Sequence, residues 1–147
     1  MQVQDIMNRN VRTVTPSTSL MEVSSIMCLY RLSGLPVVEN DKLLGFVAEK
    51  DLLARSFPSL GDFADGMRAN YEDMESQYKD VVGMRVSDVM STRVISVSPD
   101  MPVMQAAATM VRHHFRRIPV TRGDTLLGMI SLGDVHKALF HTHVSKR

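Results

Sequence analysis

The chain has 147 residues, of which 44% are hydrophobic and 22% are charged, and its formal net charge is +1. This composition is typical of a soluble globular protein and gives no electrostatic preference for nucleic acid or an anionic membrane. No apolar stretch is long enough to cross a bilayer, the N-terminus lacks the apolar core of a signal peptide, and the single cysteine, Cys28, excludes an internal disulfide. We therefore expect a cytoplasmic protein without a nucleic-acid or membrane partner.

The sequence contains an internal repeat. Residues 3–54 align with residues 86–137 without a gap, and 15 of the 52 pairs are identical. A gapless register of this length indicates a duplicated unit. The repeat predicts four parts of the chain, which are repeat 1 (1–55), a partly helical linking segment (56–85), repeat 2 (86–140) and a C-terminal tail (141–147).

The same elements are predicted in the same order in both repeats. In repeat 1 a short leading segment, residues 3–7, precedes a brief strand in residues 11–15. An amphipathic helix follows from Leu20 to Tyr30, then two apolar strands joined by the polar turn ENDK, and a second helix that starts at Asp51. Each element has a counterpart at the aligned position of repeat 2. The order β-α-β-β-α, twice, predicts a mixed α/β (α+β) fold.

One repeat is too small to bury both faces of its sheet, so we expect the two repeats to pack together with a cleft between them. The linking segment is too long for a simple connection. Its second part has apolar residues at helical spacing: Met67, Tyr71, Met74, Tyr78 and Val82. We predict one helix there that packs on the module or across a dimer, with a partner-binding helix as the alternative.

The residues that the repeats share form a pattern of consecutive motifs. They read V-x-D-[IV]-M, a strand ending in Val-x-Pro, an amphipathic helix, [LI]-P-V and G-h-h-[AS]-x-x-D, where h is hydrophobic. This pattern resembles the CBS domain, which occurs in tandem as the Bateman module, and the resemblance covers both repeats. It implies a pseudo-twofold pair with adenosine-nucleotide sites in the cleft, often associated as a disc-shaped dimer. The chain looks like a free-standing member of this family.

The resemblance also assigns roles to residues of repeat 2. Asp134 matches the ribose-binding aspartate of the family, and Ser131 matches its phosphate-facing Thr or Ser. Arg116 and Arg117 match positions where the family often carries basic residues facing phosphates. An apolar slot for adenine would come from Val97, Ile118, Pro119 and Met129. The alternatives are a plain helix cap for Asp134 and a solvated basic edge for the two arginines.

Repeat 1 offers a poorer site. Asp51 is present, but Ala48 replaces the hydroxyl, and Ser33 and Gly34 replace the two arginines. Such a site loses one hydroxyl donor and two cations that a phosphate would use. We therefore predict one competent site in repeat 2 and one degraded site in repeat 1.

These features predict a regulatory module that binds AMP, ADP or ATP, with or without Mg²⁺, and signals to a partner protein by a change in shape. S-adenosylmethionine and NAD rank behind these nucleotides. We expect a homodimer and no metal site formed by the protein alone. No set of nucleophile and base and no glycine-rich phosphate loop indicates an enzyme. The alternative is a ligand-free scaffold with a vestigial cleft, whose dimer surface is its function.

Overall fold

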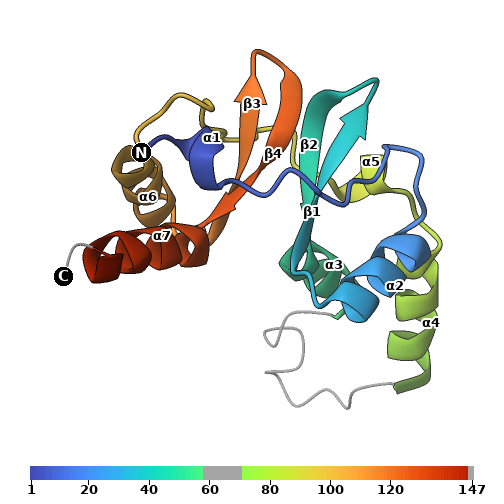
Figure 1. Cartoon of the computed structure of the whole chain (residues 1–147). Coiled ribbons are helices and arrows are strands. Elements are labelled where there is room, and N and C mark those ends of the chain that lie inside the picture. The colour runs from blue at the N-terminus through green and yellow to red at the C-terminus, as the bar shows by residue number, and fades with distance from the viewer. Residues whose placement is uncertain (58–70, 146–147) are drawn as a thin grey trace. The chain divides into compact units, whose positions relative to one another are not determined.

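The computed structural model describes residues 1–57 and 71–145, and its elements are coloured along the chain in Figure 1. The described residues form helices and strands of the predicted mixed α/β class. Their order and bounds are α1 (Val3–Ile6), α2 (Leu20–Tyr30), β1 (Gly34–Glu39), β2 (Lys42–Ala48), α3 (Glu49–Ser56), α4 (Tyr71–Val82), α5 (Val86–Val89), α6 (Val103–Arg112), β3 (Arg117–Arg122), β4 (Thr125–Ser131) and α7 (Leu132–Ser145).

The chain divides into two compact units, each built from separate stretches of sequence. The first unit consists of Met1–Arg12, Asn40–Leu43 and Val94–Arg147, and the second consists of Thr13–Glu39 and Leu44–Arg93. The first unit therefore holds the body of repeat 2, and the second holds the body of repeat 1. The leading segment of each repeat belongs to the unit that contains the other repeat.

The strands are antiparallel, and the β3–β4 hairpin predicted around the turn RGDT is confirmed. Its register runs from Arg117 opposite Ser131 to Arg122 opposite Thr125. The strand order is β1-β2-β4-β3, and the pair that links β2 to β4 is Lys42 with Thr125. Both residues of that pair belong to the first unit.

The brief strands predicted near the start of each repeat are reduced to one residue each. In repeat 1, Val14 forms a parallel bridge with Val37, and the rest of residues 11–15 is irregular. Extension of this ladder would require an N–H from Pro36 on one side and from Pro16 on the other. Proline has no N–H, so the pairing stops at one bridge. The same prolines recur at the aligned positions of repeat 2, and the equivalent segment is reduced in the same way.

Each leading segment folds into a single helical turn and packs on the body of the other repeat. The Val3 N–H of α1 donates to the Met101 carbonyl in repeat 2 (2.9 Å). The Val86 N–H of α5 donates to the Thr18 carbonyl in repeat 1, also at 2.9 Å. Figure 1 shows the blue α1 beside the elements coloured brown to red, and the yellow-green α5 beside the blue and green ones. The two exchanged segments occupy equivalent positions in the alignment of the repeats.

A glycine shared by the two repeats allows this exchange. After α1, Asn8 and Met129 of β4 exchange two backbone hydrogen bonds, at 2.8 and 2.9 Å. The Asn8 carbonyl then lies so close to Gly128 that a Cβ atom there would be 2.5 Å from its oxygen. At Gly45, the equivalent residue of repeat 1, an added Cβ atom would likewise lie 2.6 Å from the carbonyl oxygen of Ser91. Only a residue without a Cβ fits such an approach.

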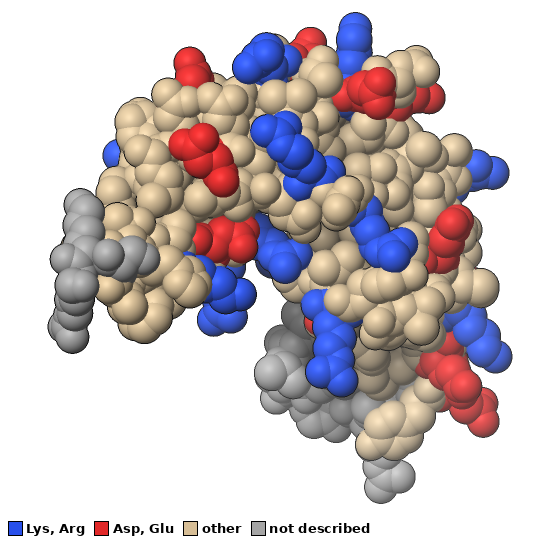
Figure 2. Space-filling model, in the orientation of Figure 1, with Lys and Arg blue, Asp and Glu red and all other residues tan. Residues whose placement is uncertain are grey.

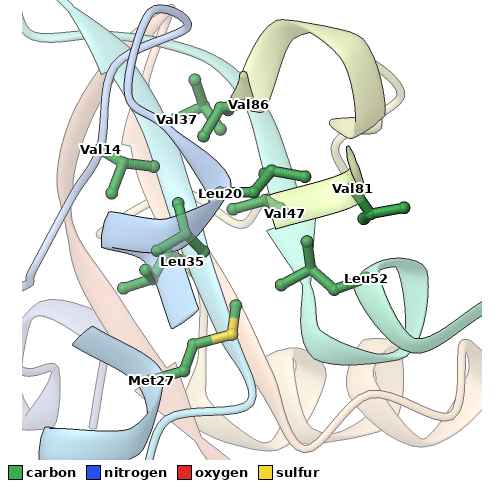
Figure 3. Close-up of a cluster of buried hydrophobic side chains, with 10 residues drawn as sticks. Val14, Leu20, Met27, Leu35, Val37, Val47, Leu52, Val81 and Val86 are labelled. Carbon is green, nitrogen blue, oxygen red and sulfur yellow. The ribbon is translucent and has the colours of Figure 1, made fainter. Parts of the chain in front are cut away.

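Each unit has its own hydrophobic core, and each core includes a valine from an exchanged segment. The core of the second unit includes Val86, which Figure 3 shows among the side chains of Val37 and Leu20. The core of the first unit includes Val3, packed with residues of β3 and β4. Both exchanged valines are completely buried, with 0% of their surface exposed. Burial of a valine contributes about 1.5 kcal/mol or more, so each exchanged segment stabilises the unit that receives it.

The helix predicted in the linking segment is confirmed as α4, which packs against α2 and α3 in the second unit. In the single chain the two tyrosines of the predicted apolar stripe are exposed, and their packing across a dimer stays a prediction. Tyr71 is 78% exposed and Tyr78 is also exposed, whereas Val81 is buried. Val81 lies about 100° around the helix from the predicted Val82, so the inward face is rotated by one residue. Met67 lies outside the described residues.

Candidate functional site

Ser131 and Asp134 meet where β4 ends and α7 begins. The Ser131 Oγ accepts a hydrogen bond from the Asp134 N–H, and the Asp134 Oδ2 accepts one from the Ser131 N–H, both at 3.0 Å. This reciprocal pair is a capping box, which satisfies two backbone donors that the helix would otherwise leave unpaired. The alternative of a plain helix N-cap for Asp134 is therefore confirmed only in part, because Ser131 is the N-cap and Asp134 takes part in the cap from the third residue of α7. The roles toward ribose and phosphate stay predictions. A carboxylate has two oxygens, and among the described residues Oδ1 of Asp134 has no hydrogen-bond partner.

Repeat 1 lacks this capping box. Ala48 occupies the N-cap position of α3 and makes no side-chain hydrogen bond there. Asp51 lies in the first turn of α3 and is half-buried, but it has no N-cap serine to pair with. The missing hydroxyl thus removes a helix cap as well as a candidate phosphate ligand. Asp51 belongs to the second unit, whereas Ser131 and Asp134 belong to the first, and its role toward a nucleotide stays a prediction.

The backbone of Arg116 and Arg117 lies directly beside the start of α7. Arg117 is the cross-strand partner of Ser131, and the Arg116 carbonyl accepts a hydrogen bond from the Leu132 N–H at 2.9 Å. Both arginines are exposed, and within the described part of the chain neither guanidinium has an ion-pair partner. The structure therefore brings Arg116, Arg117, Ser131 and Asp134 to one end of the β3–β4 hairpin, in one unit.

The four residues predicted to form the apolar slot also lie in this unit and are all buried. Pro119 stands opposite Met129 in the hairpin, and the Val97 N–H donates to the Pro119 carbonyl at 3.0 Å. Val97 and Ile118 are members of the hydrophobic core. Because Val97 and Ile118 belong to the core, we expect them to lie beneath any slot as its floor, and Pro119 and Met129 to be the residues that meet a flat ring.

Sequence reasoning missed Asn8, whose backbone forms hydrogen bonds with both the N–H and the carbonyl of Met129. Its side chain is also used, because Oδ1 accepts a hydrogen bond from the Asn10 N–H at 3.0 Å and closes a small turn. The glycine that precedes Met129 and recurs in both repeats is the sequence signal for this approach, since such a glycine indicates another backbone nearby. The partner segment could not be identified from that signal.

The charges on the surface are mixed in sign where Figure 2 shows it. Figure 2 shows Lys and Arg side chains interspersed with Asp and Glu on the face in view, in keeping with the net charge of +1. The described residues contain no group of three or more His, Cys, Asp or Glu side chains that could hold a metal ion. Among the helices of the same residues, none has the length and apolar character needed to cross a membrane.

The family model of the CBS domain matches two segments of the chain, residues 3–57 and 86–141. These segments coincide closely with the two repeats and together cover most of the chain.

Relatives of two kinds are similar to this chain in sequence. It is 29% identical over 133 residues to the CBS domain-containing protein YhcV of Bacillus subtilis, a match that covers 90% of this chain and 81% of YhcV. It is 28% identical over 138 residues to the inosine-5'-monophosphate dehydrogenase of Methanocaldococcus jannaschii. That match covers 92% of this chain but only 23% of the enzyme, so the similarity is confined to a small part of the dehydrogenase.

A solved structure of CBSX2 in complex with AMP has a similar fold, with a TM-score of 0.75 and 25% sequence identity. The match covers 97% of this chain and 98% of that one. CBSX2 is a CBS-pair protein of Arabidopsis thaliana. Because the family model covers both repeats and the fold agrees over nearly the whole length, this chain belongs to the CBS domain family and carries two CBS domains in tandem.

Proposed function

We propose that this protein is a regulatory module that senses an adenosine nucleotide through repeat 2 and signals to a partner protein. The observation that carries the proposal is that a hydroxyl, a carboxylate and the backbone of two exposed arginines meet at the start of α7, from Ser131, Asp134, Arg116 and Arg117. Among the described residues neither guanidinium has an ion-pair partner. The AMP complex of the similar protein CBSX2 supports the ligand class.

Each group has a chemical task in this proposal. Asp134 keeps Oδ2 in the capping box and accepts from the ribose hydroxyls through Oδ1. Arg116 and Arg117 donate to phosphate oxygens, and the positive end of α7 adds to their attraction for the anion. Adenine packs against Pro119 and Met129 over the buried floor.

The charge of the site favours AMP, ADP or ATP over the other candidates. Two guanidinium groups attract phosphates, and a Mg²⁺ ion would enter with a di- or triphosphate as part of the ligand. S-adenosylmethionine carries a positive sulfonium and no phosphate, so it offers the arginines less negative charge than a nucleotide does. NAD has phosphates but is much larger, and it ranks behind the three adenine mononucleotides.

The output in this proposal is a population shift. A nucleotide changes the equilibrium between two conformations only by the difference in its affinity for them, and a partner protein then binds one conformation preferentially. No catalytic step is needed. The protein acts by binding, and the dehydrogenase relative is similar only over a fraction of its length.

We also propose that the protein forms a homodimer through its helices. Met21 and Met104 are exposed at equivalent positions of α2 and α6. Phe57 and Phe140 are likewise exposed at equivalent positions, after α3 and on α7. The same exposed apolar residues thus occur in both repeats. A second copy of the chain also has two repeats, so it can cover both sets of residues at once. Sedimentation equilibrium tests this: a monomer at all concentrations contradicts it, and a dimer that Met104→Glu dissociates supports it.

One observation favours the scaffold alternative. Ser131 and Asp134 already satisfy each other in the cap, and a cap needs no ligand to explain its residues. The two functions differ in whether adenosine nucleotides bind, so the binding experiment separates them directly.

The experiment is titration calorimetry with AMP, ADP and ATP on protein shown to be free of copurified nucleotide. The variant Asp134→Asn keeps an oxygen for the Ser131 N–H and so preserves the cap, while it replaces the second oxygen, the acceptor for the ribose hydroxyls, by an amide donor. The matched control is Asp51→Asn in repeat 1. We expect Asp134→Asn to weaken binding at least about tenfold and Asp51→Asn to change it less than about threefold. Equal losses would place the site elsewhere, and no binding to the native protein would favour the scaffold.

A further inference from the structure

The N-terminal residues Met1–Asn8 form a segment that we call the strap. It contains α1 and lies on the first unit, far in sequence from the residues that it contacts. At its start the Met1 carbonyl accepts a hydrogen bond from the Val103 N–H at 3.2 Å, and at its end Asn8 exchanges two with Met129. Between these points the N–H groups of Val3 and Gln4 donate to repeat 2, and the Val3 side chain is fully buried.

The strap contacts the same elements that carry the candidate site. Val3 packs in the core cluster that includes Val97 and Ile118, the floor of the proposed slot. Asn8 occupies both backbone groups of Met129, which lies just before Ser131 on β4. Removal of the strap would therefore open a cavity under the floor and leave Met129 unpaired on one side of β4.

The attachment of the strap is local and modest. Its helix has only four residues, which is too short to be stable in isolation, so its conformation depends on the unit beneath it. A few backbone hydrogen bonds and the buried side chains of Val3 and Met7 hold it. Segments attached by so few interactions open more readily than the core around them.

We propose that the strap is a conformational device: its docking orders the end of β4 from Met129 to Ser131, and its release disorders the candidate site. A ligand that requires the ordered site binds only the docked state, so ligand and strap stabilise each other. The part of this inference that concerns ligand rests on the proposed function. The part that concerns the order of β4 depends only on the contacts between the strap and the first unit.

The test is residue-resolved amide hydrogen exchange on the full chain without ligand. Val3→Ala removes two methyl groups from the strap's anchor. The matched control is Val86→Ala, the equivalent residue of α5, which is equally buried but lies in the second unit. We expect Val3→Ala to accelerate exchange about 30-fold at the N–H groups of Asn8, Met129 and Ser131, with little change elsewhere. Val86→Ala should leave these three unaffected.

Two results would overturn the inference. If Val3→Ala speeds exchange at Asn8 but not at Met129 and Ser131, the strap does not order the site. If exchange rises equally throughout the first unit, the strap is not a separately opening element. When the native protein binds AMP, Val3→Ala should also weaken that binding while Val86→Ala does not. Failure of the native protein to bind AMP refutes the proposed function and leaves the exchange result to decide on the strap.

Discussion

Replacement of Gly128 by alanine should detach the strap from β4. The new Cβ atom would lie 2.5 Å from the Asn8 carbonyl oxygen and 3.3 Å from its carbon, and both are backbone atoms that no rotamer change can move. To restore an ordinary contact distance, Asn8 must retreat by roughly 1 Å. The two Asn8–Met129 hydrogen bonds, at 2.8 and 2.9 Å, would then be stretched beyond the range of effective hydrogen bonding.

The expected loss of stability follows from these contacts. Two backbone hydrogen bonds contribute about 2 kcal/mol together. Partial loss of packing around Val3 adds about 1–2 kcal/mol. The reduced freedom of the unfolded chain offsets about 0.5–1 kcal/mol of this, because alanine is less flexible than glycine. We therefore expect Gly128→Ala to lower the free energy of unfolding by about 2–3.5 kcal/mol, or to lower Tm by about 5–10 °C.

The measurement is urea and thermal unfolding followed by circular dichroism. Gly133→Ala is the control, because its Cβ would meet nothing closer than the Ser131 Oγ at 3.5 Å, an ordinary contact. That variant should be neutral or slightly more stable, since alanine is the better helix former. Gly45→Ala should lose about as much stability as Gly128→Ala, because Ser91 approaches it in the same way. Equal unfolding midpoints for Gly128→Ala and Gly133→Ala would refute the reasoning.

Four further variants test the caps and the linking helix by the same unfolding assay. Ser131→Ala should cost about 1 kcal/mol because it removes the cap of α7, and no loss would show that the capping box contributes nothing. Ala48→Ser should gain about 0.5–1 kcal/mol by recreating that box with Asp51 in α3, so an unchanged or lower midpoint speaks against it. Val81→Ala should cost about 2 kcal/mol because Val81 is 6% exposed, whereas Tyr71→Ala should cost less than about 0.5 kcal/mol. The reverse order would contradict the observed face of α4.

The difference between the repeats has a structural and a functional side. In the proposed site the Ser131 hydroxyl has two roles, because its oxygen caps α7 and its hydrogen can be donated to a phosphate. Its replacement by Ala48 costs repeat 1 some helix stability and also a candidate ligand. The loss is consistent with a site out of use, and calorimetry on the variants of Asp51 and Asp134 measures how far the two repeats have diverged in binding.

Exchange of the leading segments changes what can be expected of fragments. A fragment of residues 1–55 would contain α1 but lack Val86, a fully buried core residue of the unit that holds repeat 1. The repeats follow the duplication in the sequence. The compact units have different boundaries, because each contains the leading segment of the other repeat. Variants of the whole chain are therefore better suited than separate repeats to test its stability.

The sequence alone determined the elements that depend on local patterns. The gapless alignment of the repeats, the apolar spacing of α2 and α6, and the polar turn of the β3–β4 hairpin predict the repeated order and the mixed α/β class without any knowledge of packing. The pairing of Ser131 with Asp134 is also local, since a capping box joins residues three apart. Interactions between residues so close in the chain can be predicted from the local sequence pattern.

Only the tertiary structure decided which repeat receives each leading segment and which face of α4 is buried. The strap meets β4 at Asn8 and Met129, near opposite ends of the chain, and the sequence of either segment is compatible with packing on its own repeat. The glycine of each repeat signals that a backbone comes close, but not which one. Long-range partners are chosen by the fit of whole surfaces in three dimensions, and that fit is not encoded in the pattern of any one segment.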